Sequence, residues 1–366
     1  MHAQDARETR FALSEDISSR LSLLKFVSIV AVVHLHSYAR VVSFRGKDLD
    51  LSDYRFTFLA ETIVNELTRF AVPLFFCISG FLFFVKDYGG GWTLFARKKT
   101  RSILLPYLLW NTVCIGYMIV LQSLPFARGY FAEEYIVSWG AADWIRAYAG
   151  FGGDWMPYLY PLWFMPALYF VFLVVYPLRS FLMKWPIVIP FVMAFNLVCQ
   201  SFGVFDVSLL PRFVNALSFF CMGYLISVYW NLIERKPVCV ICGAFFFASR
   251  ILRAVKPEYD LHVPDAVDLY PGVVSLFSLS RCFNSFPRSV KKNLLKLSSF
   301  SFLIYVLHEN FLTILKKLCY SLVPLEPFVP LTLFFAIPFV VIACLIAFGI
   351  LLDRTAPRIY RFLFSR

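Results

Sequence analysis

The sequence predicts an all-α integral membrane protein built as a bundle of about ten transmembrane helices. Its 366 residues are 60% hydrophobic and only 16% charged, whereas a soluble globular chain is roughly half apolar and about one-quarter charged. Apolar runs of about twenty residues, the length that crosses a bilayer, also recur along the whole chain. These two observations exclude a soluble globular fold.

The predicted elements follow from the apolar runs in chain order. Residues 1–17 are polar and mixed in charge and are predicted to form a cytoplasmic tail, which leaves residues 18–366 as one polytopic membrane domain. Within that domain, the runs predict helices at 21–40, 66–86, 102–122, 158–180, 186–203, 211–231, 237–252, 266–283, 297–316 and 329–352.

The basic residues set the expected orientation. The net charge is +12, but Lys and Arg lie between the apolar runs instead of forming one patch, so nucleic acid is not an expected partner. The connections around 97–101, 288–296 and 354–361 are strongly basic and are predicted to face the cytoplasm. We therefore expect a multi-pass protein of the cell (inner) membrane, in contact with its lipids and with both termini in the cytoplasm.

Most of the nine cysteines lie inside apolar runs. The CVIC segment at 239–242 has the spacing of a zinc or redox site, but the sequence around it lacks a second pair or nearby histidines. Free buried thiols are therefore expected, and no metal site is predicted.

Two histidines interrupt the first apolar run, FVSIVAVVHLHSYA. Successive helical residues turn by about 100°, so His34 and His36 point about 200° apart and cannot serve one site. Lys25 returns to within about 20° of the His36 face, roughly 16 Å away along the axis. Because ionisable groups inside a membrane usually face a bundle interior or a wet cavity, this stripe is a candidate site. The alternative, given equal weight, is a structural histidine that makes its hydrogen bond to a neighbouring helix. His34 is assigned to this structural role.

A second polar face occurs in SSFSFLIYVLHENF, residues 298–311. Ser301 and His308 share a helix face, with Tyr305 close by and Glu309 adjacent. A carboxylate can orient an imidazole and raise its basicity, so His308 and Glu309 are catalytic candidates. A hydrogen-bonded pair that joins two helices is the alternative, and periodicity does not tell whether the two polar faces meet.

A basic run precedes the third span in ARKKTRSILLPYLLWN, residues 96–111, and comprises Arg97, Lys98, Lys99 and Arg101. Such a run usually marks the cytoplasmic end of a span. The alternative is a seat for a phosphate-bearing ligand, because Arg and Lys suit phosphate oxygens. The sequence has no glycine-rich phosphate loop or dinucleotide fingerprint beside it.

These segments, in this order, resemble the acyltransferase family 3 of membrane-bound O-acyltransferases, and most closely the branch related to sugar O-acetylases. The matching stretches extend across nearly the whole chain and are LLKFVSIVAVVHLH, RFAVPLFFCISGFLFF, KKTRSILLPYLLWN, PLWFMPALYFVFLVVYP and SSFSFLIYVLHENF. The resemblance implies a helical core that takes an acyl group, usually acetyl, from acetyl-CoA on the cytoplasmic side. The acyl group then passes to a hydroxyl of a sugar or a lipid-linked glycan.

The resemblance also implies residue roles. His36 matches the position of the family's catalytic histidine, which favours a functional role for this side chain over a structural one. Lys99 and Arg101 match the basic donor motif, and Lys25 stands where the family often has arginine. Lysine keeps the charge but loses the bidentate fork of arginine. The expected donor-binding set is therefore Lys25, Arg97, Lys99 and Arg101, with acetyl-CoA as a co-substrate and no tightly bound cofactor.

The expected acceptor or oxyanion group is Arg69, Trp163 and Tyr305. Arg69 lies at the outer edge of the second span, where it can steady an acceptor or a developing oxyanion, or can extend to the interface. Two other functions fit the same charges: a transporter or flippase of a glycolipid, and a polymerase of lipid-linked sugars. Donor dependence separates them, because only an acyltransferase moves label from acetyl-CoA to a glycan.

Overall fold

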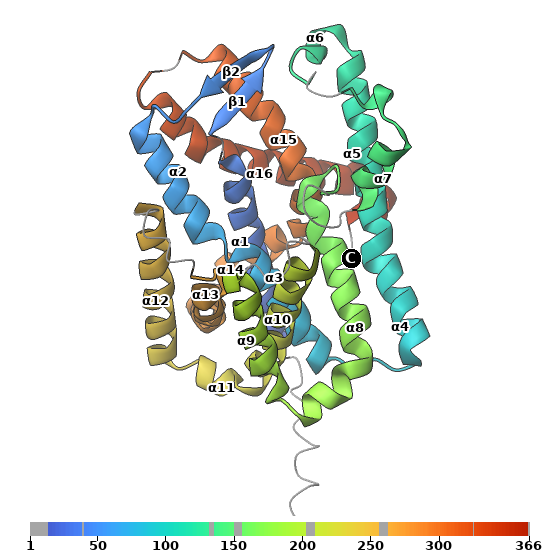
Figure 1. The fold of residues 1–366 in the computed structure, drawn as a ribbon, viewed down its shortest axis with the longest axis vertical. Coiled ribbons are helices and arrows are strands. Elements are labelled where there is room, and N and C mark those ends of the chain that lie inside the picture. The colour runs from blue at the N-terminus through green and yellow to red at the C-terminus, as the bar shows by residue number, and fades with distance from the viewer. Residues whose placement is uncertain are drawn as a thin grey trace, which may run out of the picture.

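The computed structural model describes residues 14–38, 40–131, 135–149, 156–202, 209–255, 263–324 and 326–364. Most of the predicted tail at 1–17 lies outside these residues. Helices dominate the described chain, with one small hairpin at an end of the bundle (Figure 1). The first half contains α1 (Glu15–Ser37), α2 (Arg55–Thr68), α3 (Ala71–Val85), α4 (Gly91–Lys99), α5 (Leu105–Ser123), α6 (Pro125–Arg128), α7 (Ala141–Ala149) and α8 (Phe164–Lys184). The second half contains α9 (Val188–Phe202), α10 (Leu209–Val228), α11 (Trp230–Ile233), α12 (Lys236–Val255), α13 (Ala266–Leu279), α14 (Arg288–Ser298), α15 (Ser301–Leu322), α16 (Val329–Thr355) and α17 (Pro357–Phe364).

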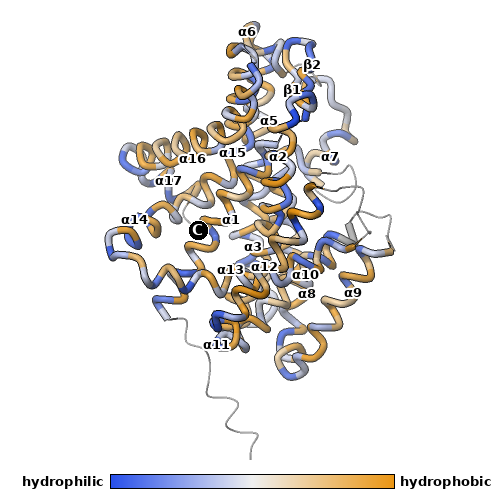
Figure 2. The backbone as a smooth tube through the Cα atoms, turned by 90° about the vertical axis from the view of Figure 1, so that its left-hand side faces the viewer, coloured by the Kyte–Doolittle hydropathy of each residue, from blue (hydrophilic) through white to orange (hydrophobic). Residues whose placement is uncertain are grey.

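Apolar helices run through most of the molecule, as the hydropathy colouring shows (Figure 2). Among the described residues, 6 helical segments are long and apolar enough to cross a membrane, and a seventh arises if the bent pair α14 and α15 is one span. The six are Glu15–Ser37, Arg55–Val85, Gly91–Ser123, Tyr160–Lys184, Lys236–Val255 and Val329–Thr355. The protein is thus a multi-pass α-helical membrane protein. The predicted number of about ten spans is not confirmed, because several predicted runs correspond to shorter helices, α9 among them.

The first span, α1, is fixed at its N-terminal end. Ser14 caps it, because the Ser14 hydroxyl accepts a hydrogen bond from the Ile17 amide at 3.2 Å. Arg20 is 2% exposed and pairs with Glu234 beside α11, while its Nε donates to Ser280 at 3.0 Å. Removing Glu234 would leave the buried Arg20 guanidinium with the more distant Asp16, 3.6 Å away, as its carboxylate partner. These contacts hold the start of α1 against α11 and α13.

The same helix ends at Ser37, short of the predicted end at residue 40, because a hairpin follows it. Strands β1 (Val41–Phe44) and β2 (Lys47–Asp50) pair antiparallel, with Phe44 opposite Lys47. Arg45 and Gly46 have φ values of 52° and 70°, as a two-residue type I′ turn requires. The all-α prediction therefore misses one small sheet, which packs with Tyr320 of α15.

The closest helix contact in the core is between α3 and α10. A Cβ atom added to Gly80 would lie 1.8 Å from the carbonyl oxygen of Phe220, and one added to Gly223 would lie 2.3 Å from the carbonyl oxygen of Cys77. Small residues allow the two backbones to approach in this way. The α3–α10 pair forms the centre of the bundle against which α1 and α8 pack.

We expect Gly80→Ala to destabilise the protein, because the new methyl group overlaps backbone atoms that cannot move aside. Overpacking of this kind costs about 1–3 kcal/mol, and more where backbones collide. The thermal unfolding midpoint in detergent measures the effect. Gly116→Ala on α5 is the matched control, since no atom lies within 4 Å of the added Cβ. Equal midpoints for the two variants would contradict the close packing of α3 and α10.

A continuous helix from Gly91 to Ser123 combines α4 and α5 through a π-helical stretch, Thr100–Leu104. Such stretches accommodate one extra residue and are frequent at functional sites. The Thr100 hydroxyl lies 2.9 Å from the hydroxyl of Tyr169 on α8. This helix carries the basic run at one end and Asn111 further along.

Candidate active site

The C-terminal end of α1 meets α15 and a 3₁₀ turn, Tyr160–Trp163, that precedes α8. Buried Asn111 fixes this turn from α5: its amide oxygen accepts from the Leu159 amide at 2.9 Å, and its amide nitrogen donates to the Ala147 carbonyl. Tyr305 fixes the turn from α15, because its hydroxyl donates to the Pro161 carbonyl at 2.8 Å. Two helices therefore set the position of Tyr160.

Tyr160 links His36 to Glu309. The Tyr160 hydroxyl donates to Oε2 of Glu309 at 2.9 Å and lies 2.7 Å from Nδ1 of His36. A phenol has one proton, and Glu309 receives it, so we infer that Nδ1 of His36 is the donor in the second contact. The Nε2 atom of His36 is then unprotonated. A neutral imidazole oriented through its far nitrogen is the arrangement of a general base.

The polar faces of α1 and α15 meet at this point. The rings of His36 and His308 have centroids 5.4 Å apart. Nδ1 of His308 lies 3.0 Å and 2.8 Å from the carbonyl oxygens of Ile304 and Tyr305, which can only accept, so Nδ1 carries the proton. Nε2 of His308 is buried and has no hydrogen-bond partner in the described chain. His308 is thus oriented by the backbone of its own helix, whereas the Glu309 carboxylate lies beside Tyr160 and His36.

Two further side chains of α15 hold the site. Lys316 donates to the His36 carbonyl at 2.9 Å, which satisfies one of the carbonyls left without a partner at the end of α1. Thr313 donates to Oε1 of Glu309 at 3.2 Å. Both oxygens of Glu309 are therefore engaged, and its side chain is only 14% exposed. In contrast, Tyr160 is 37% exposed, so the site is reachable from outside the bundle.

His34 lies on another side of α1. Its Nδ1 is 2.8 Å from the Val30 carbonyl, and its ring packs edge-on against Phe339 of α16 with centroids 5.0 Å apart. These are contacts within and between helices. The structure therefore separates the two histidines of VVHLH as helical geometry predicts.

The predicted acceptor residues occupy two places. Arg69 and Trp163 line one cavity of about 970 Å³. Arg69 is engaged there, with Nε 3.1 Å from Glu66 and a terminal nitrogen 2.8 Å from Asp265. Tyr305 instead holds the 3₁₀ turn, so the geometry makes it a positioning residue for Tyr160.

The predicted donor residues lie nearer the other end of α1. Lys25 and Lys99 are both half-buried, and each has a repulsive electrostatic interaction with Lys86, which follows α3. The ammonium of Lys99 lies 3.5 Å from the centre of the Phe172 ring. Arg97 and Arg101 are exposed on the same helix as Lys99. The structure thus places Lys25 and Lys99 each near Lys86 in one cationic group, while Arg97 and Arg101 are exposed.

Sequence reasoning missed Tyr160, Lys316, Asn111 and Lys86. Asn111 ends the quoted segment KKTRSILLPYLLWN, and its position inside an apolar run is a signal for a buried polar role. Lys316 lies at the end of a predicted span, where lysines are common. Tyr160 is one of 19 tyrosines and gives no signal of its own.

Comparison with known proteins identifies the family of this chain. A family model described as acyltransferase 3, acyltransferase domain, matches residues 19–349. The succinoglycan biosynthesis protein ExoH of Rhizobium meliloti (strain 1021) is 25% identical over 359 residues, which covers 94% of this chain and 91% of that protein. No solved structure matches the chain. Because the family match covers nearly the whole chain and includes the histidine end of α1, the protein belongs to the acyltransferase 3 family and is an acyltransferase.

Proposed function

We propose that the protein is an O-acyltransferase that moves an acyl group, with acetyl as the expected one, from acyl-CoA to a sugar hydroxyl. The acceptor is a cell-surface polysaccharide or its lipid-linked precursor. The acyltransferase family supports the reaction class, and similarity to a protein named for succinoglycan biosynthesis supports the acceptor class. The observation that carries the proposal is the Glu309–Tyr160–His36 chain, because it prepares His36 to take a proton.

The proposed step uses the free Nε2 of His36. This atom takes the proton of the sugar hydroxyl while the sugar oxygen attacks the thioester carbonyl carbon. The C–S bond breaks, and the coenzyme A thiolate takes the proton back from His36. Glu309, acting through Tyr160, stabilises the imidazolium that exists between the two proton transfers.

The cationic group suits the donor's phosphates. Lys25 and His36 lie on one face of the continuous helix α1, roughly 16 Å apart along its axis. In this proposal the phosphates of acyl-CoA bind Lys25, Lys86 and Lys99, and the pantetheine arm bridges the distance to His36. The donor would enter at the lysine end, which the basic connections predict to be cytoplasmic.

The test is transfer of label by the purified protein in sealed liposomes, whose bilayer separates two compartments. Radiolabelled acetyl-CoA is supplied on the lysine side, and polysaccharide isolated from cells that lack the gene is the acceptor. We expect labelled polysaccharide with the mass increment of one acyl group per modified sugar. Movement of an unmodified glycolipid across the bilayer, with no covalent label on it, would favour a transporter instead.

Lys99→Gln should raise the KM for acyl-CoA about tenfold or more, because a charge-assisted hydrogen bond to phosphate is lost. Lys98→Gln is the matched control, since Lys98 is adjacent but exposed and lies outside the cationic group. Steady-state kinetics with acyl-CoA as the varied substrate measures both. A normal donor KM in Lys99→Gln would mean that Lys99 only packs on the Phe172 ring.

A further inference from the structure

The cavity of about 970 Å³ lies beside the histidine end of α1. Its wall includes Leu35, the residue before His36, and Trp163, which ends the turn that begins with Tyr160. Side chains from α2, α9 and α10 close it on other sides. Its volume is at the upper end of the roughly 300–1,000 Å³ typical of small-molecule sites. The cavity thus borders the residue next to His36 and the end of the Tyr160 turn, while the side chains of His36 and Tyr160 are not among those that line it.

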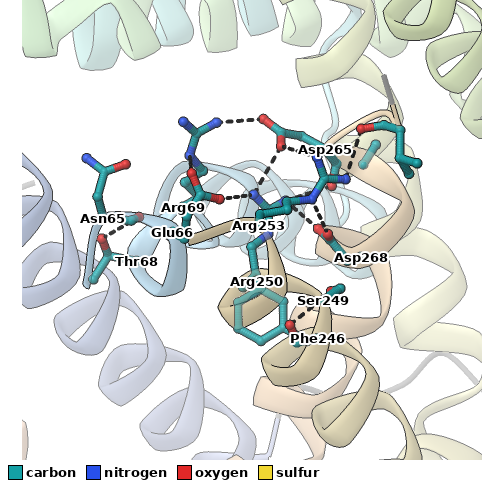
Figure 3. Close-up of polar contacts among 12 residues, drawn as sticks. Asn65, Glu66, Thr68, Arg69, Phe246, Ser249, Arg250, Arg253, Asp265 and Asp268 are labelled. Atoms are coloured by element: carbon teal, nitrogen blue, oxygen red, sulfur yellow. Dashed lines mark hydrogen bonds and ion pairs between the residues drawn. The ribbon is translucent and has the colours of Figure 1, made fainter. Parts of the chain in front are cut away.

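The network of paired charges that Figure 3 shows includes four residues that line the cavity, Glu66, Arg69, Arg253 and Asp265. Arg250 is fully buried and contacts Glu66 at 2.9 Å, Asp265 at 3.0 Å and also Asp268. Arg69 joins Glu66 to Asp265. The buried Arg250–Asp268 pair lies behind these four charged side chains that line the cavity.

This network is balanced in charge. Arg69, Arg250 and Arg253 face the carboxylates of Glu66, Asp265 and Asp268. Burial by itself would raise the pKa of Asp265, but Arg69, Arg250 and Arg253 hold that pKa below its ordinary value. Asp265 therefore stays ionised at neutral pH. The cavity offers donors and acceptors in fixed positions without an excess charge of either sign among its described residues.

Amide groups extend the polar lining. The side-chain oxygen of Asn215 accepts from Asn196 and from Gln200, each at 3.1 Å, which orients the Asn215 amide. Asn65 and Asn215 both line the cavity. Trp163 adds an aromatic wall. Oriented amides, arginine–carboxylate pairs and one indole suit a ring that carries hydroxyl groups on its edge and C–H groups on its face.

We infer that this cavity is the acceptor subsite and that it selects a neutral sugar residue. Vicinal hydroxyls can donate to Glu66 or Asp265 and accept from Arg69 at the same time, so they add to the network without breaking it. A phosphate or uronate would find each arginine already paired and would meet two carboxylates. The acceptor role rests on the proposed function, whereas the preference for a neutral sugar follows from the cavity itself.

The experiment measures binding first. Purified protein in nanodiscs is titrated with a neutral galactan tetrasaccharide and, separately, with a galacturonan tetrasaccharide of the same length. We expect the neutral chain to bind at least tenfold more tightly. Asn65→Ala should weaken its binding about three- to tenfold through loss of a hydrogen bond, whereas Asn231→Ala, at an exposed position of α11, should not. Thermal midpoints for both variants establish that they are folded.

A charge variant sharpens the selectivity test. Glu66→Gln keeps an acceptor for Arg250 but gives the cavity one excess positive charge. We expect the preference for the neutral chain over galacturonan to fall about tenfold or more. Equal affinity of the native protein for both chains, or an Asn65→Ala variant that binds as tightly as Asn231→Ala, overturns the inference.

The two proposals fail in different ways. Absence of acyl transfer to any glycan overturns the proposed function, but binding of the neutral tetrasaccharide that Asn65→Ala weakens still supports the subsite. Conversely, acyl transfer that continues with an unchanged acceptor KM in Asn65→Ala supports the function and overturns the subsite. A change in the KM for acyl-CoA in Asn65→Ala would place the donor in the cavity and also overturn it.

Discussion

His36→Ala is expected to reduce acyl transfer by about a hundred- to ten-thousand-fold, because general-base catalysis contributes rate factors of that size. The protein should still reach the membrane in near-normal amounts. Among the described residues, the side chain of His36 makes one hydrogen bond, to Tyr160, and hydrogen bonds between membrane helices average only about 0.6 kcal/mol. Activity per inserted protein is the measurement that separates catalysis from folding.

His34→Ala is the matched control, two residues away on the same helix. Its bond to the Val30 carbonyl and its contact with Phe339 lie on another side of α1, so most activity should remain. His308→Ala should fall between the two, because its ring borders His36 but is oriented by its own backbone. An inactive His34→Ala with an active His36→Ala would contradict both the helical geometry and the assigned base.

Glu309→Gln is expected to cost up to about a thousandfold in rate with little change in the KM for acyl-CoA. Oε2 of Glu309 lies 3.9 Å from Nδ1 of His36. A unit charge at about 4 Å stabilises an imidazolium by about 4 kcal/mol at an effective dielectric constant near 20, which corresponds to roughly a thousandfold. Glutamine keeps the shape and still accepts from Tyr160, so the change is mainly electrostatic.

Tyr160→Phe should give a smaller loss, about ten- to a hundredfold, because it removes the bridging hydroxyl but leaves the carboxylate. Asp353→Asn, an exposed carboxylate near the end of α16, controls for the loss of a negative charge. Single-turnover kinetics with both substrates saturating reports the chemical step. If Glu309→Gln and Asp353→Asn turn over equally fast, Glu309 only joins helices.

The six long spans and the separation of His34 from His36 could be predicted because both depend on local sequence. Apolar length decides whether a helix crosses a membrane, and a fixed turn of about 100° per residue decides which face a side chain occupies. The bent or short helices were harder to assign, because segments such as α9 and the Arg212–Val228 part of α10 are apolar but too short for a full span.

The rest of the site could not be predicted because its members meet only in the folded chain. Tyr160 is 124 positions from His36 and 149 from Glu309. Periodicity placed Tyr305 and His308 on one helix and left open whether Glu309 acts on His308 or joins two helices, but it gave no indication that Tyr160 is a partner of Glu309. The hairpin also had a local signal, the Arg45–Gly46 turn, which the surrounding apolar runs concealed.

The π-helical stretch Thr100–Leu104 constrains how this chain can change during evolution. Lys99 precedes the stretch, and Asn111, which fixes the turn that carries Tyr160, follows it on the same helix. Deleting one residue from the stretch would restore a regular α-helix, rotate one end against the other by about 100° and shorten it by about 1.5 Å. Homologous chains that lose this residue must therefore reposition either their donor lysine or their tyrosine turn, so insertions and deletions here should be coupled to substitutions at both ends.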